Sequence, residues 1–404
     1  MKIGRTVLVI GLILGLYVTM GWAGVTPLEL SEETAEEPAR IRGTEWLKKF
    51  NESRDSFAQK YGTRFGFVLN YVQQVILRNN RDVGNSRSLW YWNLEVSQEL
   101  WQGAEVFTEF EVDKNKGIDK FIPTYSYFDS DSGKNAGLYV PELYLEQHLT
   151  RDKIIIAAGK LDLSDWFDLN EVASSSDVQF LSSPLINNYT IPFPCKGMGA
   201  MVKFQPYEWL YFQSGASTAK AVSTKVGFSD AFNSTLFINE FGFSPKLGKL
   251  PGNYRFIFHL LHRKLGVIMD DLQEERNHFG FGLSFDQAVT ERISLFVRYG
   301  SIDQKVNEVA HAWSAGGQIV EPIPGRKYDC FGVGVAQNIL GRDFRAYSDP
   351  EFTASRETML ETYYSLSFNE FLTLTCDLQV VLEPYADRTV ANPIAGSIRM
   401  LIAF

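Results

Sequence analysis

The chain has 404 residues, of which 45% are hydrophobic and 22% are charged, so it is neither a disordered chain nor a low-complexity fibre. Its formal net charge of −9 argues against a protein that binds nucleic-acid backbones in general. Three cysteines, Cys195, Cys330 and Cys376, are too few for a disulfide framework and too scattered for a zinc site.

The first residues are typical of an export signal. Lys2 and Arg5 precede an uncharged apolar run over 7–18, and small residues follow at the position of a cleavage site near Ala23. The run is too short and too close to the start of the chain for a spanning helix, although a short membrane anchor is an alternative. We therefore predict a signal peptide over 1–23 and a mature protein outside the cytoplasm.

Residues 24–61 are predicted to form an acidic leader and then an amphipathic helix. Apolar side chains recur at roughly helical spacing over 43–60, and Gly62 ends that pattern. Strand-like alternation follows, so we assign 62–404 to a single β domain.

Apolar and polar side chains alternate in the remainder of the chain. Trp90, Trp92 and Leu94, for example, alternate with Asn93 and Glu95. The same alternation recurs in five later segments, which are 105–112, 278–286, 293–300, 372–380 and 394–404. A tilted strand needs roughly nine to eleven residues to cross a bilayer, and these segments are close to that length. Strands of soluble sandwiches are shorter, about five or six residues.

Short turns and long polar connections also alternate along the chain. Among the short turns are 207–208, 290–292 and 369–370. The long connections are 113–135, 160–196, 216–235, 302–328 and 341–356. This asymmetry is typical of outer-membrane proteins. We predict an all-β fold, a transmembrane antiparallel β-barrel of about 16 strands with a short N-terminal helix. The alternative is a soluble β-protein that buries its aromatic side chains in a sandwich core.

If the apolar set faces lipid, the polar set lines a lumen. The two kinds of charge then lie on different strands, Glu95, Glu99, Glu105, Glu109 and Glu111 against Lys203, Arg255, Arg298 and Arg399. Opposed acidic and basic walls would present donors and acceptors to a solute with many hydroxyl groups. A generic polar lumen that binds nothing in particular explains the alternation equally well.

The segment 159–196 is too long for a simple loop and is rich in Asp, Asn and aromatic residues. Asp162, Asp165 and Asp168 offer acceptors, and Trp166 offers a stacking face, a combination that suits sugars. A self-packed loop is the alternative. The acids lack the ligand spacing of a calcium loop, so we predict no metal site.

Several blocks of sequence resemble one known family. They are GKLDLSDWFD, VQFLSSPLINN, IPFP, GMGAMVKFQP, GNYRF, RKYDCFGVGVAQN, ETMLETYYSLSFNEFLTLTCDLQVVLEP and IAGSIRMLIAF. In order and spacing they resemble the carbohydrate-selective porins of bacterial outer membranes (the OprB type) over roughly 60–404. The resemblance implies a barrel of about sixteen strands that conducts monosaccharides by facilitated diffusion. Cys195 and the pair Cys376 and Asp377 depart from the family's pattern.

These observations predict a porin in the outer membrane of a Gram-negative bacterium, which would pass small carbohydrates such as glucose through a water-filled barrel. The residues predicted to contact solute are Arg255, Arg298, Glu109, Glu111, Asp162, Asp165, Trp166 and Asp168. The expected partners are small sugars and outer-membrane lipid, with no nucleic acid, and the oligomer is a monomer or a trimer. Catalytic motifs such as G-x-S-x-G and H-E-x-x-H do not occur, so we expect no enzyme and no cofactor. The alternatives are a general unselective porin and a soluble exported carbohydrate-binding β-protein.

Overall fold

The computed structural model describes residues 45–79, 84–130, 135–226, 234–266, 268, 275–347 and 352–404. The predicted signal peptide (1–23) and residues 24–44, which contain the predicted acidic leader, lie outside the described residues. Among the helices that are described, none is long and apolar enough to cross a membrane.

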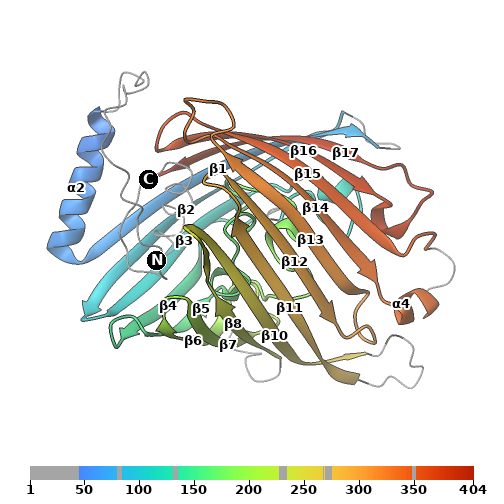
Figure 1. Cartoon of the computed structure of the whole chain (residues 1–404), viewed down its shortest axis with the longest axis horizontal. Helices are drawn as coiled ribbons and strands as arrows, with labels where there is room; N and C mark the ends of the chain where they lie inside the picture. Colours follow the sequence, from blue (N-terminus) through green and yellow to red (C-terminus); the bar gives the residue numbers. More distant parts are fainter. Residues whose placement is uncertain are drawn as a thin grey trace.

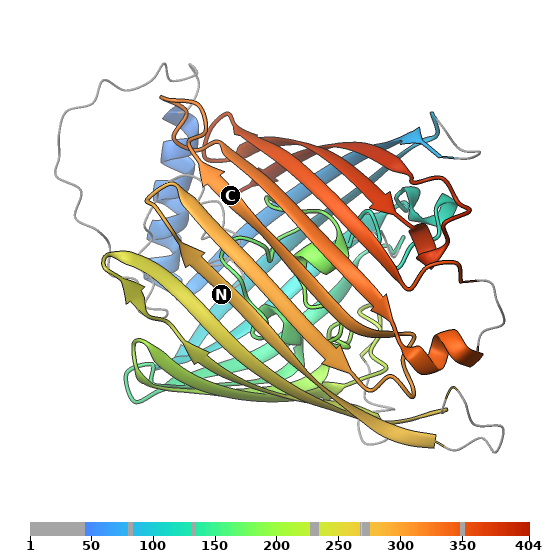
Figure 2. The ribbon, with the colours of Figure 1, turned by 45° about the vertical axis from the view of Figure 1, so that its right-hand side comes forward.

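The strands form one antiparallel sheet that closes on itself (Figures 1 and 2). They are β1 (Thr63–Arg78), β2 (Ser86–Trp101), β3 (Ala104–Lys114), β4 (Tyr139–Leu149), β5 (Ile154–Leu161), β6 (Gly197–Tyr207), β7 (Leu210–Thr218), β8 (Thr235–Phe243), β9 (Lys246–Leu247), β10 (Leu250–Gly266), β11 (Glu275–Ala288), β12 (Ile293–Ile302), β13 (Val309–Val320), β14 (Cys330–Leu340), β15 (Arg356–Ser367), β16 (Leu372–Leu382) and β17 (Ile394–Ala403). Of the 17 strands in the described residues, β9 has only 2 residues, and β8 pairs directly with β10 past it. The other sixteen form a ring that β1 and β17 close, which confirms the predicted barrel.

Helices occupy only short parts of the described chain. They are the α-helices α2 (Glu45–Tyr61), α3 (Ser183–Ile186) and α4 (Arg342–Tyr347) and the 3₁₀ helices η1 (Ile118–Phe121), η2 (Leu163–Asp165) and η3 (Pro384–Ala386). The position of α2 confirms the predicted N-terminal helix, which lies at one end of the barrel near the carboxy terminus (Figure 1).

The alternation of side chains separates the two faces of the barrel wall as the sequence predicts. Phe258 and Phe279 point outward and are 62% and 67% exposed. Their neighbours Ile257 and His278 point inward and are 0% and 1% exposed. An outer surface of bare apolar side chains is stable against acyl chains and costly against water. The same surface argues against a sandwich with an apolar core.

One predicted loop is wrong. The connection expected over 302–328 contains strand β13, which pairs with β12 and β14. Ala and Gly make up 5 of the 12 residues of this strand and weaken its β signal. The small residues have a structural reason, because a Cβ atom on Gly316 would lie 2.7 Å from the ring of Phe296.

Two connections fold back into the barrel and fill part of its interior. We call residues 162–196 the inner loop and residues 115–138, described except for 131–134, the second loop. Phe180 of the inner loop and Phe128 of the second loop are both 0% exposed and belong to one apolar cluster with Phe296 of the barrel wall. The sequence leaves open whether the inner loop enters the barrel, and the structure places it inside (Figure 2).

Candidate functional site

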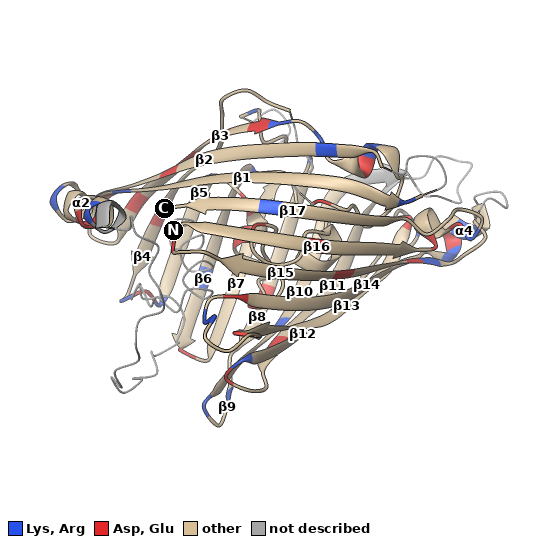
Figure 3. Cartoon of the chain, turned by 90° about the horizontal axis from the view of Figure 1, so that it is seen from above, with Lys and Arg blue, Asp and Glu red and all other residues tan. Residues whose placement is uncertain are grey.

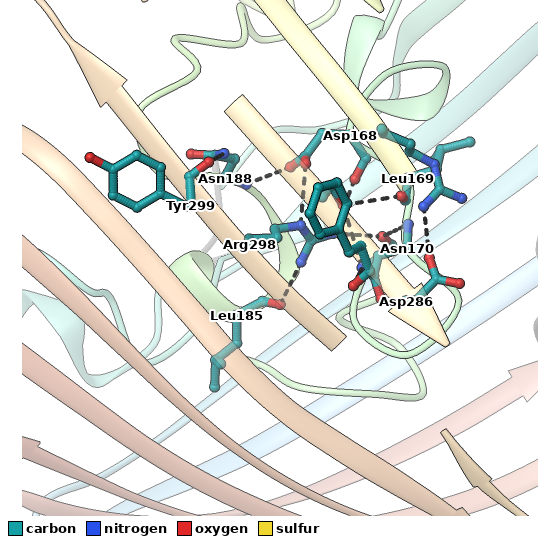
Figure 4. A network of polar contacts seen from close by, with 12 residues as sticks. Asp168, Leu169, Asn170, Leu185, Asn188, Asp286, Arg298 and Tyr299 are labelled. Atoms are coloured by element: carbon teal, nitrogen blue, oxygen red, sulfur yellow. Dashed lines mark hydrogen bonds and ion pairs between the residues drawn. The ribbon is translucent and has the colours of Figure 1, made fainter. Parts of the chain in front are cut away.

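The inner loop is fixed to the barrel wall by Arg298, which projects inward from β12 (Figure 4). Its guanidinium group donates from Nε to Asp168 Oδ1 at 3.2 Å and from Nη1 to the carbonyl of Leu185 at 3.0 Å. Nη2 donates to the carbonyl of Asp168 at 3.0 Å and to the Ser174 hydroxyl at 3.1 Å. Arg298 is 1% exposed. Its hydrogen bonds join three separate parts of the inner loop, at Asp168, Ser174 and Leu185, to strand β12.

Asp168 is held from other directions as well. Its backbone N–H donates to Glu240 of β8 at 2.8 Å, and its Oδ2 accepts from the N–H of Asn188 at 2.5 Å. Burial raises the pKa of the Asp168 carboxyl, and the positive charge of Arg298 opposes that rise. The residue has a φ of 57°, a left-handed conformation that costs free energy and persists because these contacts over-determine it.

Glycine lets the inner loop approach this part of the wall closely. A Cβ atom on Gly300 would lie 2.0 Å from the hydroxyl of Thr190 and 2.3 Å from Oδ1 of Asn188. Asn188 uses the space to donate to the carbonyl of Tyr299 at 2.9 Å. Any larger side chain at position 300 would push the inner loop away from β12.

The opposite side of the inner loop is tied to the last strands of the barrel. Glu361 of β15 accepts from the N–H groups of Leu181 and Ser182, at 2.5 Å and 3.0 Å. Arg399 of β17 donates to the carbonyl of Gln179 at 2.5 Å and pairs with Asp377 of β16 at 2.6 Å. Hydrogen bonds to charged groups are stronger than those between neutral groups. Together with Glu240 of β8, these residues fasten the inner loop to opposite sides of the barrel.

Four of the predicted solute contacts gather around Lys196, at the end of the inner loop. Lys196 Nζ lies 2.8 Å from Glu109 and 3.6 Å from Glu111, both on β3. It also lies 3.4 Å from Glu142 of β4. Carboxylate oxygens of Glu142, Asp162 and Asp165 lie within 4.8 Å of one another. We call these six residues the acidic cluster.

The acidic cluster holds five carboxylates and one lysine, so negative charges outnumber positive ones among its six residues. Its three carboxylates on Glu142, Asp162 and Asp165 form the one grouping in the described part of the chain that has the spacing to hold a metal ion. Such groupings are common beside water without any ion, and Lys196 already contacts one of them. Glu109, Glu111 and Glu142 are buried, at 1%, 7% and 1% exposed, whereas Asp162, Asp165 and Lys196 are half-buried. The acceptors and the donor that the cluster can present to a solute are therefore those of Asp162, Asp165 and Lys196.

Trp166 lies in the chain between Asp165 of the acidic cluster and Asp168, which Arg298 holds. Its side chain is packed rather than open to water. Its side chain is 5% exposed, and its ring meets that of Tyr144 edge-on with centroids 6.3 Å apart. Its backbone carbonyl accepts from Gln213 of β7 at 2.6 Å. A stacking role toward a solute stays a prediction, and it requires part of this packing to open.

The structure separates the eight predicted contact residues. Glu109, Glu111, Asp162 and Asp165 belong to the acidic cluster, and Arg298 and Asp168 hold the inner loop. Arg255 pairs with Asp286 within the wall, and Trp166 lies in the chain between Asp165 and Asp168. Contact between any of the eight and a solute stays a prediction.

The expected basic wall facing water is wrong as a description of the barrel. Lys203, Arg255, Arg298 and Arg399 are 7%, 5%, 1% and 1% exposed. Arg255 pairs with Asp286 of β11 at 2.7 Å, and the other two arginines hold the inner loop. An unpaired buried cation is costly, so the three arginines lie against the inner loop or neighbouring acids. The ammonium group of Lys203 lies 4.5 Å from the centre of the Tyr211 ring.

Four residues of the site are not predicted from the sequence. Lys196 and Glu142 complete the acidic cluster, and Glu240 and Glu361 hold the inner loop. A signal exists for Glu142, because it alternates with apolar residues in the same way as Glu109, its partner in the register of β3 and β4. No pattern in the sequence singles out Lys196.

The second loop packs over the inner loop. Glu357 of β15 accepts from the N–H groups of Tyr125 and Ser126, at 3.0 Å and 2.7 Å. The N–H of Ser130 donates to the carbonyl of Leu181 in the inner loop at 3.0 Å. Burial raises the pKa of Asp119, in the same loop, to about 6. The two loops therefore form one layer inside the barrel.

Comparison with known proteins gives sequence relatives and structural neighbours. Porin AaxA of Chlamydia felis is 24% identical over 250 residues, which are 60% of this chain and 53% of that protein. Porin AaxA of Chlamydia caviae is 26% identical over 256 residues, 60% of this chain and 52% of that protein. The chain spans about half the length of the curated relatives it matches.

Among solved structures, the high-pH structure of Pseudomonas putida OprB superposes with a TM-score of 0.77 at 17% identity, covering 88% of this chain and 97% of that one. The outer-membrane channel DcaP of Acinetobacter baumannii gives a TM-score of 0.55 at 10% identity, covering 85% and 97%. At these identities the likeness shows the fold. A family model described as "Carbohydrate-selective porin, OprB family" matches residues 101–404. The barrel and this match together show that the chain belongs to the OprB family of porins of the bacterial outer membrane.

Proposed function

We propose that the protein is a channel in the outer membrane of a Gram-negative bacterium through which small carbohydrates diffuse down their gradient. The observation that carries this proposal is the inner loop, which crosses the interior of a closed barrel and is bonded to Glu240 of β8 on one side and to Arg399 of β17 on the other. A fixed loop narrows the lumen to a defined cross-section, and the acidic cluster beside it offers acceptors to hydroxyl groups. No covalent step is needed.

Conduction requires weak binding, because a solute that binds tightly leaves slowly. We therefore expect millimolar affinity for sugar, on the order of −4 kcal/mol. The signal peptide over 1–23 and the division between the leader with its helix and the β domain at residue 62 are part of the same proposal, since an outer-membrane barrel must first be exported.

Planar bilayers and liposomes test the proposal together. Purified protein should give stepwise currents that glucose reduces, and liposomes should swell faster in monosaccharides than in disaccharides. Currents that ignore every sugar in a panel would favour a general unselective porin. The absence of both currents and swelling, with a folded barrel shown by heat-modifiable migration, would overturn the channel itself.

A further inference from the structure

Helix α2 packs on the outside of the barrel, at the end where the carboxy terminus lies (Figures 1 and 3). The ring of Phe57 lies 5.3 Å from that of Phe65, and the ring of Phe50 lies 5.3 Å from that of Phe404. The helix thus touches the barrel through two aromatic pairs, and its direction runs across the strands.

These aromatic partners belong to the lipid-facing side of the wall. Val68 of β1 packs against Val178 of the inner loop, inside the barrel. Because neighbours on a strand point to opposite faces, Phe67 and, two positions earlier, Phe65 point outward. Phe67 stacks on Phe404 with centroids 5.2 Å apart. The helix therefore extends the outer aromatic surface at the rim.

The aromatic face of α2 is only partly covered by the barrel. Phe50, Phe57 and Tyr61 lie on one side of the helix, at the spacing of two and three turns. They remain 39%, 39% and 53% exposed. At the level of lipid head groups such rings are stabilised, because one part can meet acyl chains while another stays wet.

An open groove runs along the flank next to this aromatic face. Lys49 and Lys60 stand at its ends, and Ser53 and Ser56 lie between them. One acid, Glu52, borders the groove, which leaves it with an excess of positive charge. The Ser53 hydroxyl donates to the carbonyl of Lys49 within the helix, at 2.8 Å. Two ammonium groups and the Ser56 hydroxyl match the phosphate and glycerol oxygens of an anionic lipid head group.

We propose that α2 is an interfacial anchor that binds anionic phospholipid in the leaflet at this rim. Phe50, Phe57 and Tyr61 enter the acyl boundary, while Lys49 and Lys60 hold head-group phosphates. The short turns lie at the same rim, so the leaflet is the periplasmic one. This inference rests on the membrane location of the proposed channel and goes beyond transport. A helix held in this way would fix the junction between the leader and β1.

Hydrogen exchange measured by mass spectrometry tests the anchor on the whole protein in nanodiscs. With phosphatidylcholine alone as reference, adding about one third phosphatidylglycerol should slow exchange of the amides in 45–61 by roughly tenfold or more, since each basic residue near an anionic surface contributes about fivefold. The double change Lys49→Gln with Lys60→Gln should remove that lipid-dependent slowing. The matched control, Lys153→Gln with Lys249→Gln at exposed turns of the same rim, should retain it.

Strand amides report folding in the same experiment, and salt gives a second measurement that needs no variant. Raising salt from 0.05 M to 0.5 M should weaken the slowing in the unaltered protein, because screening shortens the reach of the charges. Equal exchange with and without phosphatidylglycerol would overturn the anchor, as would slowing that survives the loss of both lysines. Bilayer currents recorded on the same protein test the channel separately, so the failure of one proposal is distinguishable from the failure of the other.

Discussion

Arg298 of β12 and Asp168 of the inner loop form an ion pair inside the barrel, with an Nε to Oδ1 distance of 3.2 Å and side chains 1% and 0% exposed. Because both side chains are buried, water cannot take the place of either partner. Removing one partner of such a buried pair costs about 3–5 kcal/mol, because a lone charge is left behind. The pair therefore couples the position of the inner loop to the barrel wall.

Replacing the arginine should release the inner loop from β12. We expect Arg298→Met to raise single-channel conductance and to weaken block by sugar several-fold, since the lumen becomes wider and less defined. Single-channel recording measures both quantities. Arg292→Gln is the control, because Arg292 is an arginine of the neighbouring turn with a side chain 57% exposed.

A double variant separates loss of the pair from loss of a cation. Arg298→Met with Asp168→Asn leaves no lone charge, so the barrel should be more stable to urea than the single variant Arg298→Met. Conductance and sugar block equal to those of the parent in the single variant would contradict the assigned role of the pair.

Lys196 should set the ion preference of the channel. It is the cation among Glu109, Glu111 and Glu142, at distances of 2.8, 3.6 and 3.4 Å. Lys196→Gln should remove a positive charge from beside these carboxylates and increase selectivity for cations, seen as a shift of the reversal potential in a potassium chloride gradient. Glu109→Gln with Glu111→Gln should shift it in the opposite direction.

A lysine outside the cluster provides the comparison. Lys225 is exposed in the connection between β7 and β8, so Lys225→Gln should leave the reversal potential close to that of the parent. An equal shift from Lys225 and Lys196 would mean that overall charge, and not the acidic cluster, governs ion preference.

Much of the barrel can be predicted from the sequence because each wall residue faces either the outer, lipid-facing surface or the interior of the barrel. Trp92 and Glu95 differ by an odd number of positions, so they lie on opposite faces whatever the remainder of the chain does. Strand β13 is not predicted in this way. The residues around Gly316 are small because Phe296 packs against them, so apolar and polar side chains alternate little there.

The site is less predictable because its contacts join distant parts of the chain. Arg298 and Asp168 are 130 residues apart, and no local pattern states that they meet. The alternation places Arg298 inside the barrel, but it cannot distinguish a lumen filled with water from one filled with loop. Lys196 follows a turn and has no periodic neighbours, so its role depends on the folded structure.

Trp166 is predicted to affect sugar passage through the packing of the inner loop. Removing a large buried side chain costs about 3–5 kcal/mol through lost contacts and a cavity. We expect Trp166→Ala to change sugar block measurably while the barrel keeps its heat-modifiable migration, because the ring of strands does not depend on this side chain. Trp166→Phe should keep most of the parent's behaviour.

Trp209 supplies the control for that change, because it is 46% exposed at the rim and stacks on Tyr207 outside the lumen. Trp209→Ala should leave sugar block unchanged. If Trp166→Ala and the parent show the same block for every sugar, Trp166 has no part in solute passage.

Asp119 should make the stability of the second loop depend on pH. Its Oδ1 accepts from the N–H of Phe128 at 2.5 Å, and burial raises its pKa from 3.8 to about 6. Between about pH 4 and pH 6 the folded state therefore holds a proton that the unfolded state has lost, so stability falls as pH rises through this window.

Asp119→Asn cannot titrate and should gain stability relative to the parent between pH 4 and pH 7. Thermal unfolding at several pH values measures this difference, with Asp55→Asn on the exposed side of α2 as the control. A difference between parent and Asp119→Asn that stays constant from pH 4 to pH 7 would show that the charge of Asp119 does not oppose packing of the second loop.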